Sequence, residues 1–227
     1  MLCFTCLAYA QDAVLIFSKT KGYRHASIGA GKAALIKLGV NNGFRADTTE
    51  DAGTFTPASL KRYRAVVFLS TTGDVLDAEQ QRAFEQYIRG GGGYVGIHAA
   101  ADTEYGWPWY NQLCGAYFLS HPKQQTADVA VIDKTHPSTK MLPDRWRRFD
   151  EWYNYKDIVG GLKVLATLDE KTYEGGQNGP VHPIAWYRQF DGGRSFYSGG
   201  GHTDESYSEP LFLDHLLGGI RWAMRKD

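Results

Sequence analysis

The sequence carries no excess of either charge, because 25 Lys and Arg balance 25 Asp and Glu and the formal net charge is zero. A protein that binds nucleic acid or an anionic membrane surface normally carries a basic excess. The chain also lacks an apolar run of the roughly 18 residues that a membrane-spanning helix needs. These absences argue against a nucleic-acid partner and against a membrane span.

Cysteine is scarce, with 3 residues in 227, and two of them fall within residues 1–10. That segment is an apolar run ending in Ala8-Tyr9-Ala10, the small-x-small pattern of a signal-peptide cleavage site. We therefore expect residues 1–10 to be a signal-peptide remnant and the protein to be exported, either to the periplasm or to the medium. The alternative is an extra N-terminal strand in a cytoplasmic protein. Cleavage would leave Cys114 alone, so no disulfide framework is expected.

Two common motifs are missing. The glycines at 90–93 precede an apolar run, whereas the glycines of a dinucleotide-binding fingerprint follow a strand and open a helix. We therefore expect no nucleotide cofactor. Residues 96–100 have the small-x-nucleophile-x-small frame of a nucleophile elbow, but His98 takes the place of Ser or Cys. A covalent acyl-enzyme mechanism at His98 is therefore disfavoured.

The first half of the chain alternates buried-strand patterns with helix patterns. Helices are predicted after Ser27, at Thr56-Pro57 and after Asp77, where a side-chain cap or an N-terminal proline starts each one. This alternation predicts an α/β protein with a parallel sheet covered by helices on both faces. Because residues 11–227 contain no linker or repeat, they are predicted to form one domain. The strands are expected at 13–18, 44–48, 65–70 and 94–97.

The pattern loosens after Asp102. Residues 117–122 are interpreted as a loop, and Asp191-Gly192-Gly193 indicates a hairpin between two apolar runs. Helices are expected at 107–115 and 210–224, and strands at 126–132, 149–153, 162–168, 183–187 and 194–198.

Ionisable side chains stand at the predicted strand ends or in the loops beyond them. In open α/β sheets, ligands bind outside the carboxyl ends of the strands. A neutral imidazole can ligate a metal, and one that titrates near its reference pKa of about 6.5 can transfer protons. A nearby carboxylate can orient the ring. The candidates are Lys19, Arg24, His25, His98, Asp102, His121, Glu151, His182, Arg194 and His202.

Structural interpretations compete with these roles. Asp102 is equally well explained as a helix N-cap. Arg24 and Arg194 either form surface ion pairs or bind an anion or a sugar hydroxyl. His136 and His215 are expected to be structural or solvated.

Seven short motifs follow one another between residue 13 and residue 225, and their combination is more specific than any one of them. They are Lys19-Thr20-x-Gly22-Tyr23-Arg24-His25, Val95-Gly96-Ile97-His98-Ala99-Ala100-Ala101-Asp102, Gly115-x-x-Phe118-x-x-His121-Pro122, Asp150-Glu151-Trp152-Tyr153, His182-Pro183-x-x-Trp186, Gly193-Arg194 and Gly200-x-His202.

In this combination the motifs resemble the trehalose-utilisation (ThuA-like) family. The resemblance implies a flavodoxin-like three-layer sandwich with a mainly parallel central sheet, akin to the class I glutamine amidotransferases, with His98 replacing the cysteine of the elbow. It also implies carbohydrate catabolism, acting on 3-keto-glycosides made by a partner sugar 3-dehydrogenase. Export is common in the family, which agrees with the predicted leader.

Two functions follow as hypotheses. The first is an isomerase, lyase or hydrolase acting on an oxidised sugar, whose keto group acidifies the neighbouring C–H bond. In it, His98 is base or metal ligand with His25 beside it, Glu151 and Asp102 orient the imidazoles, and Lys19 or Arg24 stabilises the enolate oxygen. The second is a sugar-binding protein without catalysis. With 14% aromatic residues, the chain has many side chains that could stack on a sugar. The expected substrate-binding residues are Arg24, Trp107, Tyr110, Trp152, Trp186 and Arg194, with Trp109 as a further stacking candidate.

A divalent transition metal, zinc or a similar ion, is also expected. Its candidate ligands are His25, His98, His121 and His202, which are predicted to meet at one end of the sheet although none has a local zinc-site spacing. Imidazoles within about 5 Å of each other would favour catalysis or metal binding, whereas dispersed ones would favour binding or a structural role.

Overall fold

The computed structural model describes residues 11–227. The predicted leader at 1–10 lies outside the described residues, and both the leader and the single domain after it stay predictions. No helix within 11–227 has the length and apolar character to cross a membrane.

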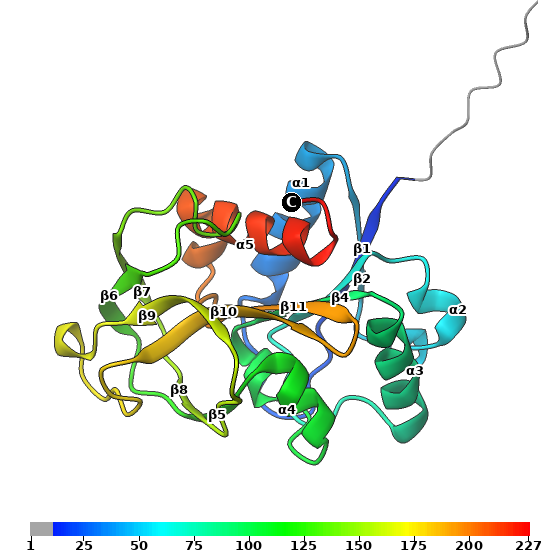
Figure 1. Ribbon diagram of the computed structural model, residues 1–227, viewed down its shortest axis with the longest axis horizontal. Helices are drawn as coiled ribbons and strands as arrows, with labels where there is room; N and C mark the ends of the chain where they lie inside the picture. The colour runs from blue at the N-terminus through cyan, green and yellow to red at the C-terminus, as the bar shows by residue number, and fades with distance from the viewer. Residues whose placement is uncertain (1–10) are drawn as a thin grey trace, which may run out of the picture.

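A nine-stranded sheet runs through the molecule in the order β2-β1-β3-β4-β11-β10-β9-β6-β7 (Figure 1). From β2 to β11 the neighbours are parallel, and from β11 to β7 they are antiparallel. The parallel half has the strand order of a flavodoxin-like sheet. Its strands are β1 (Ala13–Phe17), β2 (Arg45–Thr49), β3 (Ala65–Leu69), β4 (Gly93–Ile97) and β11 (Gly193–Ser198). The antiparallel half consists of β6 (Gln125–Val131), β7 (Arg145–Asp150), β9 (Lys163–Leu168) and β10 (His182–Phe190).

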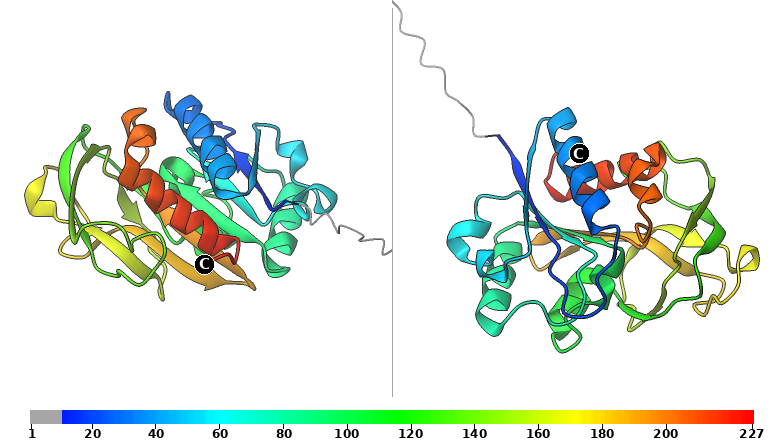
Figure 2. Two further views of the ribbon diagram at one scale, coloured as in Figure 1. Left: turned by 90° about the horizontal axis from the view of Figure 1, so that it is seen from above. Right: turned by 180° about the vertical axis from the view of Figure 1, so that it is seen from behind.

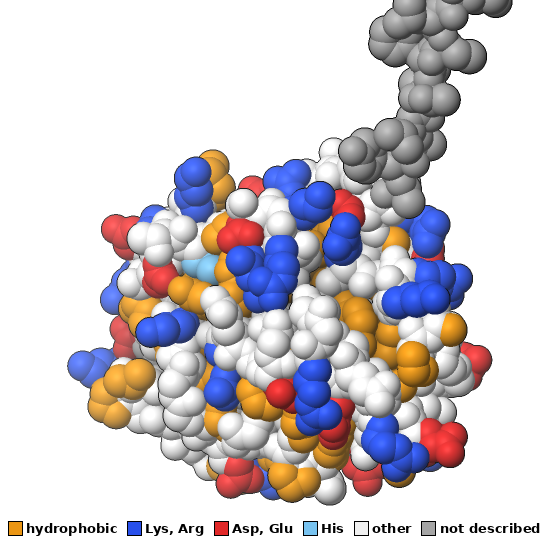
Figure 3. Space-filling model, turned by 45° about the vertical axis from the view of Figure 1, so that its right-hand side comes forward, with side chains coloured by type: hydrophobic (Ala, Val, Ile, Leu, Met, Phe, Trp, Pro, Cys, Tyr) orange, Lys and Arg blue, Asp and Glu red, His pale blue; other side chains and the backbone are white. Residues whose placement is uncertain are grey.

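Helices cover both faces of the parallel half, which makes three layers (Figure 2). One face carries α1 (Ile28–Asn42) and α5 (Pro210–Ala223), and the other carries α2 (Pro57–Leu60), α3 (Ala78–Arg89) and α4 (Pro108–Cys114). The described residues also form four short 3-10 helices: η1 (Ala52–Thr54), η2 (His98–Asp102), η3 (Glu170–Thr172) and η4 (Glu205–Ser208). On the face of the molecule drawn in Figure 3, acidic and basic side chains are interspersed.

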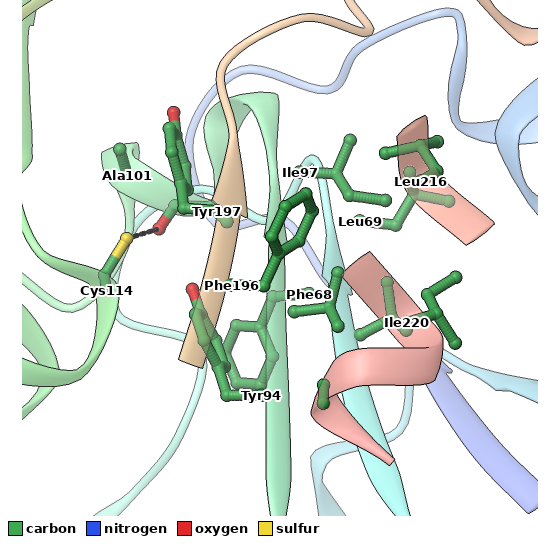
Figure 4. Packing of buried hydrophobic residues seen from close by; sticks show 14 of the residues in the cluster. Phe68, Leu69, Tyr94, Ile97, Ala101, Cys114, Phe196, Tyr197, Leu216 and Ile220 are labelled. Carbon is green, nitrogen blue, oxygen red and sulfur yellow. Dashed lines mark hydrogen bonds between the residues drawn. The ribbon is translucent and has the colours of Figure 1, made fainter. Parts of the chain in front are cut away.

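The core fills both sides of the parallel strands, and one part of it lies between these strands and α5 (Figure 4). Leu216 and Ile220 of α5 face the sheet at Leu69 and Ile97, and all four side chains are buried. Phe68, the neighbour of Leu69 in β3, points to the other face of the sheet, where its fully buried ring packs against Phe84 of α3 and Tyr110 of α4. Because strands buried on both faces must be apolar throughout, β1, β3 and β4 were recognisable as continuous apolar runs.

Of the helix caps expected in the first half of the chain, the structure confirms the one at Asp77 but not the ones at Ser27 and Asp102. The Asp77 side chain accepts hydrogen bonds from the amides of Glu79 and Gln80, which completes a capping box at the start of α3. Ser27 does not cap α1, because its hydroxyl donates to the Gly201 carbonyl instead. Asp102 is not an N-cap either, since it ends η2.

The second half differs from the prediction at residues 117–122. The structure has a strand there, β5 (Tyr117–Ser120), which pairs with β8 (Asn154–Lys156) in a separate two-stranded sheet. The strand predicted at 149–153 is also placed differently, because β7 ends at Asp150. Glu151 therefore follows a strand instead of lying within one.

Candidate functional site

His98 sits in a sharp turn between β4 and η2. Its backbone φ is +51°, a left-handed conformation that is uncommon for a residue other than glycine. Gly96 is required before the turn because a Cβ there would lie 2.6 Å from the Tyr94 hydroxyl oxygen. A strained strand-to-helix turn of this kind is the geometry of a nucleophile elbow, and here the elbow presents an imidazole.

Three imidazoles converge next to this turn. The ring centroids of His25 and His98 are 4.8 Å apart, those of His25 and His202 are 5.0 Å apart, and those of His98 and His202 are 5.1 Å apart. His25 lies in the loop after β1, His98 follows β4, and His202 lies in the loop after β11. They meet because these parallel strands end at one edge of the sheet.

Glu151 joins the imidazoles from the antiparallel half. Its Oε2 lies 3.0 Å from Nδ1 of His202 and 3.5 Å from Nε2 of His98, and its Oε1 lies 3.1 Å from Nδ1 of His121. Burial by itself would raise the pKa of this carboxyl, but hydrogen bonds from His202 and His98 outweigh it and hold the pKa below its usual range. Glu151 therefore stays ionised.

His25 lines the pocket, yet its side chain is almost completely buried. Burial, followed by the charges of His98 and His202, lowers its pKa to about 3. The ring is therefore neutral at physiological pH, and its buried Nδ1 has no hydrogen-bond partner among the described residues.

Asp150 holds the backbone of two site residues in place. It is fully buried, and Arg148 Nη1 lies 2.9 Å from its Oδ2. Its Oδ1 accepts from the amides of Glu151, at 2.9 Å, and His202, at 3.0 Å. One buried carboxylate thus fixes the backbone of two site residues on different loops.

A pocket of about 410 Å³ opens above the cluster. Burial raises the pKa of Asp102 at its wall, and the Tyr105 hydroxyl donates to this carboxyl at 2.6 Å. His98 does not line the pocket, since it is fully buried under Tyr153, whose ring centroid lies 4.3 Å away. His98 therefore faces the cluster and not the pocket. The lining residues are Tyr23, His25, Asp102, Phe118, His121, Gln124, Glu151, Tyr153 and His202.

Three of the predicted cationic residues lie outside this pocket. Arg24 forms an exposed ion pair with both oxygens of Glu50, the alternative considered for it above. Lys19 donates to the Val75 carbonyl at 3.0 Å. Arg194 bonds the Trp222 carbonyl and Asp227 near the chain's end.

The predicted aromatic binding residues also lie elsewhere, because packing uses them. Each polar atom on these rings is bonded inside the protein: Trp107 to Glu85, Tyr110 to Ala100, Trp152 to Gln125 and Trp186 to Cys114. Trp109, the further candidate, bonds Asp191.

Sequence reasoning did not assign roles to several residues at the site. Four of them lie within the short motifs that carry the family resemblance, and this position in the sequence could have identified them as site residues: Tyr23, Phe118, Asp150 and Tyr153. Gln124 also lines the pocket, but it lies outside these motifs and nothing in the sequence marks it as a site residue. A larger cavity of about 960 Å³ lies at the opposite end of the sheet beside Asp12 and Arg64, but it contains no histidine.

The strand order, the three layers and the elbow define a flavodoxin-like α/β protein of the class I glutamine amidotransferase-like type, with His98 at the elbow. The chain belongs to the trehalose utilisation (ThuA) family, whose profile matches residues 13–223. No curated protein matches it.

Solved structures agree with this assignment. A ThuA-like protein from Bacteroides uniformis is 28% identical, covers 98% of this chain and 96% of its own, and superposes with a TM-score of 0.80. A ThuA-like protein from Parabacteroides merdae is 23% identical, with coverage of 95% and 90% and a TM-score of 0.79. A cytoplasmic protein from Salmonella typhimurium shares the fold at 12% identity, with coverage of 93% and 99% and a TM-score of 0.68.

Proposed function

We propose that the protein is an enzyme of carbohydrate catabolism that removes a proton next to the keto group of 3-keto-glycosides or related oxidised sugars. The observation that carries this proposal is the Glu151 carboxylate at the pocket, with His121 on one oxygen and His202 and His98 on the other. Membership of a trehalose utilisation family supports a carbohydrate substrate. Converging imidazoles and carboxylates suit general acid–base catalysis.

His121 is the proposed base. Its Nδ1 lies 2.9 Å from the Pro122 carbonyl oxygen and 3.1 Å from Glu151 Oε1. Both partners are acceptors, so Nδ1 carries the proton of the neutral ring and Nε2 keeps its lone pair. The side chain is 43% exposed and lines the pocket. His121 Nε2 takes the proton, the C–H electron pair forms a C=C bond to the carbonyl carbon, and the negative charge moves to the keto oxygen.

Asp102 is the proposed acid, because burial raises its pKa and it lies at the pocket wall. In β-elimination the glycosidic C–O bond breaks, and protonated Asp102 gives its proton to the leaving oxygen. In isomerisation the proton returns to carbon instead, and addition of water after elimination amounts to hydrolysis. A 3-keto substrate arises by oxidation of a glycoside, so we expect a sugar 3-dehydrogenase in the same pathway.

The test is incubation with 3-keto-trehalose and 3-keto-glucosides in D₂O, followed by NMR. We expect deuterium at the carbon next to the keto group and new products, with unoxidised trehalose left unchanged. His121→Gln and Glu151→Gln should lose exchange, whereas Glu79→Gln, an exposed carboxyl on α3, should keep it. Binding of the keto-sugar without exchange would support the alternative, a sugar-binding protein without catalysis.

We also propose export, on the pattern of residues 1–10. N-terminal sequencing after expression with the native upstream sequence tests it, and the expected first residue is Gln11. Cytosolic protein that retains Met1 would contradict export.

A further inference from the structure

His25, His98, Glu151 and His202 bring four ligating atoms within 4.8 Å of one another. Three of these contacts are shorter still: His98 Nε2 to His202 Nδ1 is 3.1 Å, His202 Nδ1 to Glu151 Oε2 is 3.0 Å, and His98 Nε2 to Glu151 Oε2 is 3.5 Å. Tetrahedral zinc ligands, about 2.0–2.2 Å from the ion, stand roughly 3.4 Å apart. The triangle of donors is therefore the size that one small cation requires.

With neutral rings, these three atoms have too few protons to hydrogen-bond with one another in every pair. His98 Nδ1 lies 3.0 Å from the Gly199 carbonyl oxygen, which can only accept, so Nδ1 carries the proton and Nε2 has a lone pair. Glu151 Oε2 also has only lone pairs. A single proton on His202 Nδ1 can serve one of these atoms but not both. With both rings neutral, at least one pair of lone pairs therefore faces each other, and either a further proton on one ring or a cation between the three atoms would remove this repulsion.

His25 supplies an independent observation. Its side chain is 4% exposed, and its Nδ1 has no hydrogen-bond partner among the described residues. An unpaired buried nitrogen is costly, and this one belongs to a ring that packs against both His98 and His202. A metal ion ligated by this nitrogen would satisfy it.

We infer that His25, His98, Glu151 and His202 together bind one divalent transition-metal ion. Three imidazoles and one carboxylate suit zinc and its first-row neighbours, whereas Mg²⁺ and Ca²⁺ prefer all-oxygen sites. Glu151 thus takes the place that the sequence assigned to His121, which contacts the other carboxylate oxygen. The ligands also have the outer support that metal sites need: Gly199 orients His98, and Asp150 holds the amides of Glu151 and His202.

The inference rests on the proposed function for its chemistry, since a cation beside the pocket would stabilise the charge that develops on the keto oxygen. Metal binding itself is measured without substrate. Untagged protein is analysed for metals as purified, stripped with chelator, and titrated with Zn²⁺, Co²⁺ and Mg²⁺ by calorimetry. Co²⁺ absorption in the visible range reports its coordination.

We expect about one equivalent of Zn²⁺ or Co²⁺, no binding of Mg²⁺, and a higher melting temperature of the loaded protein. His202→Ala and Glu151→Gln should each weaken Zn²⁺ affinity at least 100-fold. The matched controls His215→Gln, a buried histidine outside the cluster, and Glu79→Gln should bind as the unchanged protein does.

The inference would be overturned if folded protein bound less than about a tenth of an equivalent of Zn²⁺ or Co²⁺. It would also be overturned if the His202→Ala and Glu151→Gln variants bound Zn²⁺ as tightly as the unchanged protein. If metal-free protein still catalyses proton exchange and does not bind added Zn²⁺, the metal site is wrong and the proposed function is upheld. One equivalent of metal without any reaction of keto-sugars would uphold the metal site and remove the function.

Discussion

Nε2 of His98 lies 3.1 Å from Nδ1 of His202, although the two residues are 104 positions apart in the chain. The distance follows from the pairing of β4 with β11, in which Ile97 is the register partner of Ser198. Parallel neighbours end at the same edge of a sheet, so the residues beyond their ends must meet. The two imidazoles are thus held by the central hydrogen-bond ladder of the fold.

His121→Gln should lower the rate of proton exchange at least 100-fold, because it removes the proposed base while leaving the buried cluster in place. The half-exposed side chain contributes little to the core, so the melting temperature and the metal content should stay unchanged. NMR in D₂O and metal analysis measure these quantities. A normal exchange rate in His121→Gln would show that another group takes the proton.

His98→Asn and His98→Val should separate the two roles of this position. Asn tolerates the left-handed backbone at φ +51°, whereas a β-branched residue there is strained. We expect Val to be less stable than Asn by about 2 kcal/mol in free energy of unfolding. Both should bind metal more weakly than the unchanged protein. Denaturant unfolding checks the difference, and equal stability would argue that His98 is unstrained.

Two helix glycines should respond in opposite directions to alanine. A Cβ on Gly29 in α1 would meet nothing within 4 Å, so Gly29→Ala should stabilise the protein by about 0.5 kcal/mol through helix propensity. A Cβ on Gly218 in α5 would lie 2.5 Å from backbone atoms of Pro137 and Ser138. Gly218→Ala should therefore cost about 2 kcal/mol. Denaturant unfolding measures both, and a stable Gly218→Ala would mean that α5 can move.

Phe68→Ala should cost about 3–5 kcal/mol, because the ring is fully buried between the sheet and the rings of Phe84 in α3 and Tyr110 in α4. Calorimetry or denaturant unfolding reports the loss. A cost below about 1 kcal/mol would mean that the core collapses into the space.

Acid should destabilise the fold through its buried histidines. Burial lowers the pKa of both His136 and His215 to about 4. Their folded pKa lies below the unfolded value of about 6.5, so their contribution is complete above pH 6.5 and is lost as the pH falls towards 4. Each should contribute about 2 kcal/mol to the difference in unfolding free energy between pH 7.5 and pH 5.

The control for this pH dependence is His215→Gln. It should reduce the loss of stability at pH 5, relative to pH 7.5, by about 2 kcal/mol. An unchanged pH dependence would show that His215 is not neutral in the folded protein.

The parallel half of the fold was predictable because its signals are local. Runs such as 65–69 are apolar throughout, and Asp77 caps its own helix. β5 was not predictable, because its pairing partner is remote: Tyr117 lies opposite Lys156 in another part of the chain. The apolar character of a short segment does not identify a strand without that partner.

The site shows the same division. His25, His98 and His202 were candidates because they follow predicted strands, and Glu151 was one because a carboxylate can orient an imidazole. Trp186 was misassigned because aromatic content does not say which ring is buried, and here the ring is fully buried. Local reasoning offered an ion pair for Arg24 but could not name its partner, because Glu50 lies after a different strand.

The pocket is lined by residues from two parts of the fold, the small β5–β8 sheet and the ends of the central strands. Phe118, His121 and Gln124 come from one stretch in and after β5, outside the nine-stranded sheet. The buried histidines are anchored to the central strands instead. Side chains of the outer wall can therefore be changed without touching the inner cluster, so that engineering of substrate preference should begin with Phe118 and Gln124 and keep His121, the proposed base.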